Sequence, residues 1–480
     1  MTDWPSLIIL IIIQCVGLFA AVHAIMHKTD PRSATGWAGL IFFVPGIGAL
    51  LYWWLGINRV HTRAKRIFKN KITSEIFSDR HRYCSRLDKN VEERIPIYIA
   101  KFIPFMDRVA GKELHKGNTI NILVNGDQAY PAMLDQINRA KCSIALCSYI
   151  FDNDKTGRQF AQALNAASDR GVVVRILIDD IGAKYSFPSI IHHLKGKNLK
   201  VNKFLKSFLP WKINYAQLRL HRKLLIVDGH VAFIGGLNIR EGHILADTPT
   251  DKAISDLHFK VEGLVVADLM QVFAADWKFS SHEILQGTKW FPTLREEGNA
   301  LIRTVVDGPD EDFDKLRWTL LGALATANES VSIVTPYFIP DQSLLAALEL
   351  ASLRGVHVNI ILPQKNNLRL VHWAAMSQLS QVLAKGCHIY FTPPPFDHSK
   401  IMIVDNMWSL VGSANWDARS LMLNFELNIE CIDQNLATKL AEIIQQKMQV
   451  ASKLSLEDLH SRAFVLRLRD SCARLISPYL

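Results

Sequence analysis

Two apolar stretches without a charged residue open the chain. The first, residues 7–26, is about as long as a helix that crosses a 30 Å hydrocarbon layer. The second, residues 36–57, carries the aromatic residues of an interfacial belt near its two ends, at Trp37, Tyr52, Trp53 and Trp54. The pattern predicts that residues 1–60 form a two-helix transmembrane hairpin.

Two alternatives to full spans stay open. A cleaved signal peptide is disfavoured because the leader MTDWP has no Lys or Arg, and it leaves the second stretch unexplained. Pro45 and Gly46 could kink the second segment or make it re-entrant. Six basic residues follow the second segment: Arg59, Arg63, Lys65, Arg66, Lys69 and Lys71. They predict that the C-terminal part is cytoplasmic. They either contact anionic headgroups or lie in a solvated linker.

From about residue 119 onward, β-rich runs alternate with amphipathic helical patterns, which predicts an α/β fold. A strand, a helix ending in Arg-Gly, and a second strand occur twice in the same order, at 143–151, 160–171 and 172–180, and again at 330–339, 344–355 and 356–364. Tyr149 and Tyr337 occupy matching places in the repeat. The repeat predicts two homologous α/β domains facing each other across a pseudo-two-fold axis. We expect a basic juxtamembrane linker at 61–118, a first domain at 119–300, and a second domain with a basic C-terminal tail at 301–480.

The composition limits the class of protein and the kinds of binding partner. With 49% hydrophobic and 21% charged residues, the chain is neither disordered nor fibrous. A formal net charge of +10 favours nucleic acid, phosphorylated substrates or anionic lipid. The seven cysteines form no C-x-x-C pair, so neither a disulfide framework nor a zinc site is indicated.

Each half contains the pattern H-x-K-x-x-x-x-D followed, ten residues later, by Asn. The first copy consists of His221, Lys223, Asp228 and Asn238, and the second of His398, Lys400, Asp405 and Asn415. One copy is a weak signal, but two copies at matching places in a repeat are unlikely to coincide by chance.

The spacing of these residues indicates phosphoryl chemistry. His and Lys two positions apart project from the same face of a strand, so two such strands at a domain interface would form a pocket of imidazoles, ammonium groups and amides. A neutral His can attack phosphorus while an opposing protonated His donates to the leaving oxygen. Lysines and asparagines would hold the nonbridging oxygens, so the chemistry requires neither a metal ion nor another cofactor. Asp228 and Asp405 stand at odd offsets from the lysines and should face away from the ligand.

The paired motifs resemble those of the phospholipase D superfamily, and the whole chain is similar to bacterial cardiolipin synthases of the two-span type. The resemblance implies a ping-pong transfer between two phosphatidylglycerol molecules through a phosphatidyl-histidine, giving cardiolipin and glycerol. It assigns His221 as nucleophile and His398 as general acid and then base, although the near symmetry of the site allows the two roles to be exchanged.

The resemblance also implies supporting residues. Asp256 and Glu426 are the candidates for the carboxylates that orient the histidines. The alternative is that these two acids only cap or pair with other residues in the fold. Asp228 and Asp405 support the site and bind no ion. Asn238, Asn415 and Ser413 would bind substrate, and Gly236 stands where the superfamily usually has Ser, so we expect the first half to lack one hydroxyl contact to phosphate.

Two further stretches suggest lipid contact. Residues 200–215 interleave lysines with aromatic residues, as a headgroup-level segment or a packed loop would. A basic amphipathic helix is predicted near the C-terminus, placed either against the membrane or against the catalytic domains; it contains Arg462, Phe464, Arg467, Leu468, Arg469, Arg474 and Ile476.

The resemblance makes phosphatidylglycerol, cardiolipin and an anionic bilayer the expected partners, and predicts a multi-pass protein of the bacterial inner membrane. A membrane-bound phospholipase D, which uses water as the second nucleophile, is the first alternative. A nucleic-acid phosphodiesterase is the second; the membrane segments and the lack of a nucleic-acid-binding motif argue against it, so no nucleic-acid partner is expected. A non-enzymatic scaffold leaves the paired motifs unexplained. The sequence leaves the oligomeric state and the acceptor alcohol open.

Overall fold

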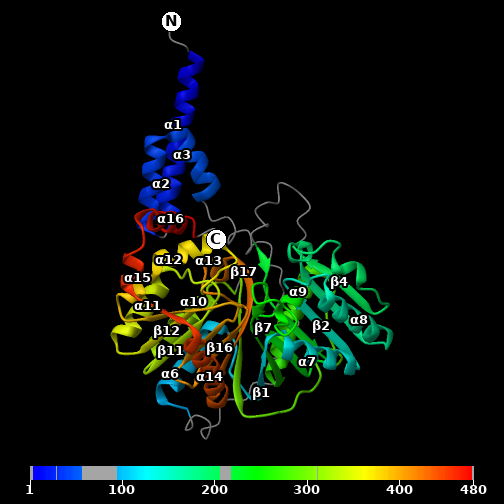
Figure 1. Cartoon of the computed structure of the whole chain (residues 1–480). Coiled ribbons are helices and arrows are strands. Elements are labelled where there is room, and N and C mark those ends of the chain that lie inside the picture. Colours follow the sequence, from blue (N-terminus) through cyan, green and yellow to red (C-terminus); the bar gives the residue numbers. More distant parts are fainter. Residues whose placement is uncertain (1–3, 29, 57–94, 206–217, 311, 478–480) are drawn as a thin grey trace. The chain divides into compact units, whose positions relative to one another are not determined.

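The computed structural model describes residues 4–28, 30–56, 95–205, 218–310 and 312–477 (Figure 1). The chain divides into two compact units, Met1–Arg66 and Ile67–Leu480. Two segments with an expected role in lipid contact lie outside the described residues. They are the basic residues between positions 59 and 71, and residues 206–215 of the stretch 200–215.

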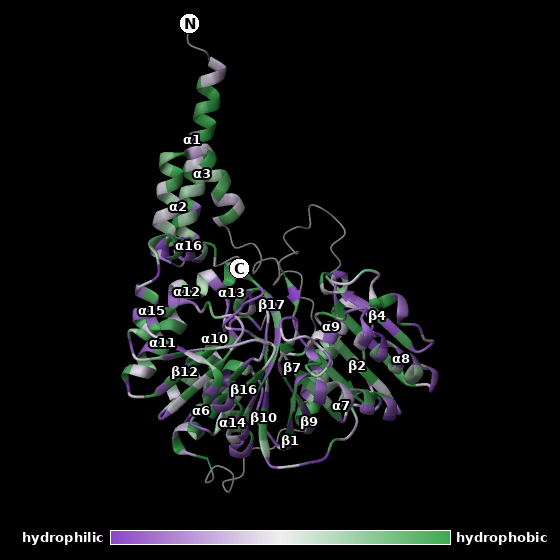
Figure 2. Cartoon of the chain, viewed as in Figure 1, coloured by the Kyte–Doolittle hydropathy of each residue, from purple (hydrophilic) through white to green (hydrophobic). Residues whose placement is uncertain are grey.

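The first unit contains one long apolar helix and a broken second segment. Helix α1 (Trp4–His27) is the one described helix that is long and apolar enough to cross a membrane. The second apolar stretch forms α2 (Pro31–Phe43), α3 (Pro45–Leu51) and the π-helical turn η1 (Tyr52–Gly56). All of these elements are largely hydrophobic in Figure 2.

The second apolar stretch, residues 36–57, is therefore not one continuous helix. The 13 residues of α2 span about 20 Å, less than the thickness of the hydrocarbon layer. Pro45 interrupts the helix because it cannot donate to the preceding turn. A Cβ added to Gly48 would lie only 2.8 Å from the Cα of Ile41, so α3 turns back and packs closely on α2. The break lies where a kink or a re-entrant turn was left open, and how the segment lies in a membrane stays a prediction.

The second unit is built on one long sheet and a separate two-stranded sheet formed by the eighth and fourteenth strands of the chain. In the first half its strands are β1 (His115–Val124), β2 (Ser143–Ser148), β3 (Val173–Asp179), β4 (Leu199–Phe204), β5 (Arg219–Leu220), β6 (Leu224–Val227), β7 (Val231–Gly235), β8 (Ile254–Ser255) and β9 (Leu257–Gly263). In the second half they are β10 (Ala300–Asp307), β11 (Ser330–Val334), β12 (His357–Pro363), β13 (His388–Thr392), β14 (Phe396–Asp397), β15 (Ile401–Val404), β16 (Trp408–Gly412), β17 (Asn424–Ile432) and β18 (Ser452–Leu454).

The strand order is the same when read outward from the middle in either direction. From β1 it runs β9, β7, β6, β2, β3, β4, and from β10 it runs β17, β16, β15, β11, β12, β13. Strands β1 and β10 pair antiparallel at the centre. The predicted duplicated α/β fold with pseudo-two-fold symmetry is confirmed, and the two halves share one continuous sheet.

Helices cover both faces of the sheet (Figure 1). They are α6 (Ile97–Ala110), α7 (Asn125–Arg139), α8 (Lys155–Asp169), α9 (Val265–Ser281), α10 (Lys315–Thr326), α11 (Gln342–Leu353), α12 (Arg369–Leu383), α13 (Ala418–Met422), α14 (Gln434–Val450), α15 (Leu456–His460) and α16 (Phe464–Leu475). Each half has its own hydrophobic core.

One boundary differs from the expected domain division. Ile99, Phe102 and Met106 of α6 are buried in the core of the second half, where α6 packs on α10. The expected linker at 61–118 therefore ends before α6. The chain completes the core of its second half with a segment that precedes the first half.

The repeated Arg-Gly pairs have a structural reason. Gly171 and Gly355 follow α8 and α11 with φ angles of +96° and +93°, a left-handed conformation that favours glycine at the end of a helix. Arg170 donates to the carbonyl of Ile137, and Arg354 donates to that of Ala327, so each arginine caps the C-terminal end of the preceding helix in its half.

Candidate active site

The motif aspartates lie in tight turns and do not face the site. Asp228 and Asp405 have positive φ angles of 52° and 51°. The Asp228 carboxylate accepts hydrogen bonds from the backbone amides of residues 141–143, and that of Asp405 accepts from residues 328–330. Each aspartate ties the strand after the motif lysine to the first repeat strand of its half, which is a role in the fold.

The motif histidines lie where the two halves cross. The short strand β5, just before His221, pairs with the start of β17, and the His221 amide donates to the Phe425 carbonyl at 3.0 Å. Strand β14, just before His398, pairs in the same way with β8, and the His398 amide donates to the Ser255 carbonyl at 2.7 Å. Backbone pairing between the halves therefore fixes the position of both histidines.

Each histidine takes its carboxylate from the other half. Nδ1 of His221 lies 2.9 Å from both Oε1 and Oε2 of Glu426. Nδ1 of His398 lies 2.7 Å from Oδ2 of Asp256. Both carboxylates are fully buried. The two acids suggested by the sequence thus lie beside the histidines, in a crosswise pairing that distance along the chain does not reveal.

The motif lysines add buried positive charge. Lys223 Nζ donates to the backbone carbonyl of His221 at 2.6 Å, and Lys400 Nζ donates to that of His398. Burial lowers the pKa of Lys223 to about 7 and that of Lys400 to about 8, while Glu426 and Asp256 act in the opposite direction. Both ammonium groups therefore lose their protons far more easily than a surface lysine does.

The surroundings of the two histidines differ. Burial lowers the pKa of His221 to about 4 against the raising effect of Glu426, so its imidazole is neutral at pH 7. Because Glu426 is the only carboxylate that pairs with His221 among the described residues, and it does so at Nδ1, we assign the proton to Nδ1 and the lone pair to Nε2. Nδ1 of His398 faces both Asp256 and Lys400 Nζ, the latter at 2.8 Å, and burial together with Lys400 and Lys223 lowers its pKa well below the usual value.

The two carboxylates also differ in their support. Burial acts to raise the pKa of Glu426, but contacts with His221, Lys223 and a hydroxyl lower it. Three further side chains donate to Glu426: Ser413 at 2.5 Å, Ser420 at 2.9 Å and Asn424 at 3.0 Å. Asp256 accepts from the Leu257 amide at 2.8 Å, and burial raises its pKa.

Gly236 and Ser413 mark this difference at equivalent positions. A Cβ at Gly236 would lie 2.3 Å from both carboxylate oxygens of Asp256, so only glycine leaves room for that carboxylate. The Ser413 hydroxyl is directed to Glu426. The structure gives Ser413 a carboxylate partner, and its expected contact with phosphate stays a prediction.

The motif asparagines are both buried, just after strands β7 and β16. Oδ1 of Asn238 accepts from the Ile150 amide at 3.1 Å, which joins it to the end of the first repeat strand. Nδ2 of Asn415 lies 3.4 Å from Asp417, while its Oδ1 has no hydrogen-bond partner among the described residues. Their binding to substrate stays a prediction.

Comparison with known families adds an independent observation. A family model described as "Cardiolipin synthase, PLD-like domain" matches residues 133–277 and 320–448. The chain belongs to this family. A second model, "Phospholipase_D-nuclease N-terminal", matches residues 15–56.

The cardiolipin synthase family includes relatives similar over nearly the whole chain. Major cardiolipin synthase ClsA of Bacillus subtilis (strain 168) is 29% identical, with 96% of this chain and 97% of the relative covered. Cardiolipin synthase 1 of Staphylococcus epidermidis (strain ATCC 35984) is 30% identical, with 98% of both chains covered. Among solved structures, phosphatidylserine synthase of Haemophilus influenzae Rd KW20 has a TM-score of 0.61 at 13% identity, covering 79% of this chain and 99% of that one, which shows a shared fold.

Several residues beside the site were not among the predicted set. The Tyr149 ring lies 5.2 Å from that of His221, and the Tyr337 ring lies 6.5 Å from that of His398. The repeat already matched these two tyrosines, and their place just after a buried strand could have marked them as site residues. His243, five residues after Asn238, lies 6.4 Å from His398, while Ser420 occupies the same offset after Asn415.

Two further residues near the site, one after each carboxylate, were also not predicted from the sequence. His258 and Asn428 stand two residues after Asp256 and Glu426 and therefore share their face of the strand. Both are buried. Neither ring nitrogen of His258, nor Nδ2 of Asn428, has a hydrogen-bond partner among the described residues. The matching spacing of D-x-H and E-x-N is the signal that could have found them.

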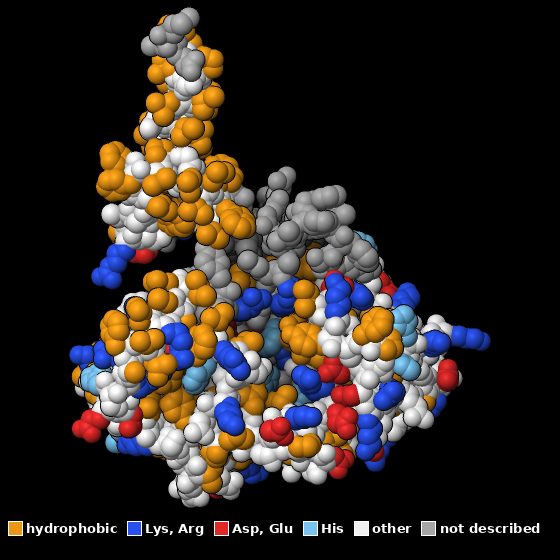
Figure 3. Space-filling model, turned by 45° about the horizontal axis from the view of Figure 1, so that its top comes forward, with side chains coloured by type: hydrophobic (Ala, Val, Ile, Leu, Met, Phe, Trp, Pro, Cys, Tyr) orange, Lys and Arg blue, Asp and Glu red, His pale blue; other side chains and the backbone are white. Residues whose placement is uncertain are grey.

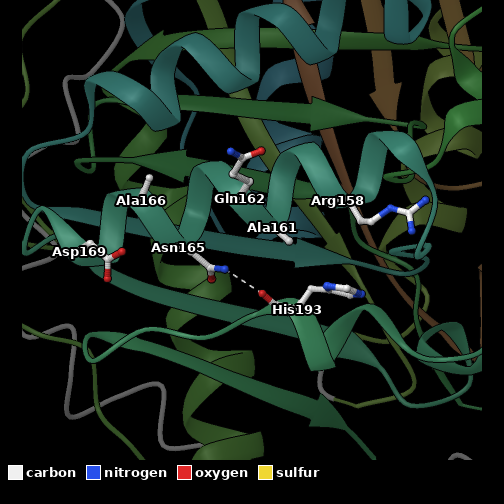
Figure 4. Close-up of a pocket in the computed structure, with 7 residues that line it drawn as sticks. All are labelled: Arg158, Ala161, Gln162, Asn165, Ala166, Asp169 and His193. Carbon is white, nitrogen blue, oxygen red and sulfur yellow. Dashed lines mark hydrogen bonds between the residues drawn. The ribbon is translucent and has the colours of Figure 1, made fainter.

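Two other features bear on ligands. The hollow drawn in Figure 4 lies between α8 and the 3₁₀ turn at Ile190–His193, is lined by residues such as Arg158, Asn165 and Asp169, and contains no motif residue. Among the described residues, no group of three or more His, Cys, Asp or Glu side chains is arranged to hold a metal ion.

Proposed function

We propose that this protein is a cardiolipin synthase, a phosphatidyltransferase that joins two phosphatidylglycerol molecules. The observation that carries the proposal is the crossed pair of buried histidine–carboxylate contacts, His221 with Glu426 and His398 with Asp256. Two motif lysines lie beside them. A site with two histidines and two ammonium groups suits an anionic phosphodiester, and cardiolipin synthases are the relatives similar over nearly the whole chain.

In the first step, Nε2 of His221 attacks the phosphorus of one phosphatidylglycerol. The bond between phosphorus and the glycerol oxygen breaks, and that oxygen takes a proton from His398. The products are free glycerol and a phosphatidyl group bound to His221. The Lys223 and Lys400 ammonium groups stabilise the charge on the nonbridging oxygens.

The second step is the reverse proton transfer with a different alcohol. His398, now neutral, takes the proton from a glycerol hydroxyl of a second phosphatidylglycerol, whose oxygen attacks the phosphorus. The bond between phosphorus and Nε2 breaks, cardiolipin leaves, and both histidines return to their starting states.

The assignment of the two roles rests on the difference between their surroundings. A nucleophile needs a neutral ring with its lone pair free, and His221 has this arrangement because Glu426 holds only its Nδ1. His398 must gain a proton before the first step. The negative charge of the bound phosphodiester raises its pKa, so that protonation of His398 accompanies binding of the lipid.

The membrane provides both substrate and location. Helix α1 anchors the chain, and its relatives named cardiolipin synthase support a bacterial membrane enzyme. We place the catalytic unit on the cytoplasmic side of the inner membrane, because basic residues follow the N-terminal apolar segments. Its partners are phosphatidylglycerol, cardiolipin and the anionic lipid surface, with no nucleic acid.

The defining experiment incubates the full chain with phosphatidylglycerol in mixed micelles and measures lipid products and free glycerol. Cardiolipin and glycerol in equal amounts are expected. Phosphatidic acid without cardiolipin would make the protein a phospholipase D that transfers to water. Cleavage of a nucleic-acid phosphodiester at a comparable rate would overturn the lipid assignment.

A phosphatidyl ester with a p-nitrophenol leaving group tests the two histidine roles. This leaving group departs without a proton, so His398→Ala should still release p-nitrophenol and accumulate the phosphatidyl-enzyme. His221→Ala should lose both by at least about 10⁴-fold. The opposite pattern would exchange the roles of the two histidines.

A further inference from the structure

The C-terminal helix α16 exposes a row of large apolar side chains. Phe464, Leu468 and Leu475 are 73%, 50% and 76% exposed. Their spacing of four and seven residues places them on one side of the helix. Val465 and Ile476 are also exposed and flank this row. We call these five residues the apolar face of α16.

The opposite side of α16 is fixed to the catalytic unit. Ala473 and Asp470 are buried where α16 packs on α12 (Figure 1). The buried Asp470 carboxylate pairs with Arg462 at 2.7 Å and with Arg469 at 2.8 Å. The guanidinium of Arg469 also lies over the Trp373 ring, 4.3 Å from its centre. The helix is thereby held with Asp470 and Ala473 toward the catalytic unit and its apolar face outward.

Such an orientation is unusual for a helix on a protein in water. A surface helix normally buries its apolar stripe in the core and exposes its charges. Because two arginines and a cation–π contact hold α16 by its polar side, rotation that would bury Phe464 and Leu468 breaks these contacts. The exposed apolar face therefore indicates a partner that is itself apolar.

The same helix is connected to the active site through one cluster. Ala473 of α16 packs with Val371 and Ala374 of α12 and with Tyr337. The Tyr337 ring stands edge-on to His398, with 6.5 Å between the ring centres. Tyr337 also donates to Asn367 at 2.8 Å, just before the start of α12. The inner side of α16, opposite the apolar face, thus packs in the same cluster as Tyr337, which stands beside the second histidine.

We propose that the apolar face of α16 inserts into the headgroup region of an anionic bilayer and seats the catalytic unit with its site beside the lipid surface. The choice of a bilayer rests on the proposed function, which takes its substrate from the membrane. Charge supports the same occupant: Arg467 and Arg474, seven residues apart, are exposed along one edge of the face. Figure 3 shows lysine and arginine side chains interspersed with hydrophobic ones over the unit that carries α16. Apolar side chains flanked by arginines are typical of interfacial helices.

The binding test uses a fluorescent label sensitive to polarity. Leu475→Cys and, as control, Leu353→Cys of α11, where the leucine is 67% exposed, are labelled in a full chain whose Cys15, Cys84, Cys142 and Cys472 are replaced by Ser. In vesicles of equal parts phosphatidylglycerol and phosphatidylcholine, the label at 475 should shift to shorter wavelength and be quenched by lipids carrying a shallow nitroxide. The label at 353 should respond as in water. Equal responses at both positions would overturn the proposal, as would a shift at 475 in lipid-free detergent that grows with protein concentration, which would indicate a second copy.

The functional test separates bilayer docking from chemistry. Turnover is measured on phosphatidylglycerol vesicles and on a short-chain phosphatidylglycerol that stays monomeric in solution. For Leu468→Asp, the ratio of vesicle to monomer turnover should fall about tenfold, because a carboxylate at the interface opposes insertion and is repelled by anionic lipid. The matched variant Leu353→Asp should keep the wild-type ratio. An unchanged ratio in Leu468→Asp would contradict the proposal, whereas absence of turnover on either substrate by the wild type would instead contradict the proposed function, with the label still reporting on α16.

Discussion

The two halves of the catalytic unit present the same histidine, lysine and asparagine at equivalent positions, yet they surround the histidines differently. Glu426, which serves His221, accepts hydrogen bonds from three further side chains and keeps its charge. Asp256, which serves His398, shares that histidine with Lys400, and burial raises its pKa. The two histidines of a duplicated site can therefore take different roles while the motif stays the same, because different groups contact their carboxylates.

The carboxylates should give the largest contrast between the halves. Glu426→Gln should slow formation of the phosphatidyl-enzyme by about 10²-fold to 10³-fold with either leaving group, because His221 loses the partner that fixes its tautomer. Asp256→Asn should slow the reaction of phosphatidylglycerol by about 10²-fold and leave the p-nitrophenyl ester nearly unaffected. Single-turnover kinetics with both substrates measures this. Equal losses on the two substrates for both variants would remove the distinction between the histidines.

The motif aspartates should show where the halves are alike. Asparagine also tolerates a positive φ, so Asp228→Asn and Asp405→Asn keep the turn but lose the charge that binds three backbone amides. Each should lower the free energy of unfolding by about 2 kcal/mol, seen as a drop of several degrees in the thermal midpoint. Asp135→Asn, on the exposed side of α7, is the control. A large fall in kcat with an unchanged midpoint would instead give these aspartates a catalytic role.

The lysines predict a pH dependence. The charged ammonium binds the phosphodiester, and in the empty site the pKa of Lys223 is about 7 and that of Lys400 about 8. As pH rises through these values the lysines lose their protons, so kcat/KM should fall by about tenfold between pH 7 and pH 9. In Lys400→Arg the guanidinium stays charged, and the fall should become shallower although the maximum is lower. An identical pH profile in this variant would show that another group causes the decline.

The hydroxyls around Glu426 should have the smallest effect. Ser413→Ala removes one of several donors to this carboxylate, and the remaining contacts keep it in place. We expect about a fivefold loss in phosphatidyl-enzyme formation. Ser420→Ala, at the same carboxylate, should behave alike. A raised KM with an unchanged kcat in Ser413→Ala, but not in Ser420→Ala, would instead support the expected contact between Ser413 and phosphate.

Much of the fold and of the site followed from local patterns. The repeat of strand, helix and Arg-Gly predicted two homologous halves. Its Arg-Gly pairs have the same structural role in both copies, since the glycine adopts a left-handed conformation and the arginine caps a neighbouring helix. The odd offset of Asp228 and Asp405 indicated residues that face away from the ligand. Asp256 and Glu426 were identified only through the family resemblance.

The rest depends on contacts between distant segments, which no local pattern encodes. The crosswise pairing of carboxylates arises from strands β5 and β14 joining the opposite half. The helix α6 belongs to the second half because its apolar side fills that core, although it precedes the first half in sequence. The second apolar segment was expected to span the membrane on length, with a kink or a re-entrant turn at Pro45 left open. Pro45 does break it into α2 and α3, which pack closely at Gly48.

The crosswise pairing also sets an order of events during synthesis. His221 leaves the ribosome 205 positions before Glu426, the carboxylate that holds its ring. In a growing chain, His221 therefore lacks its orienting carboxylate until the last segments are made. A chain that ends before Glu426 should for the same reason form the phosphatidyl-enzyme at least about 10²-fold more slowly than the full chain.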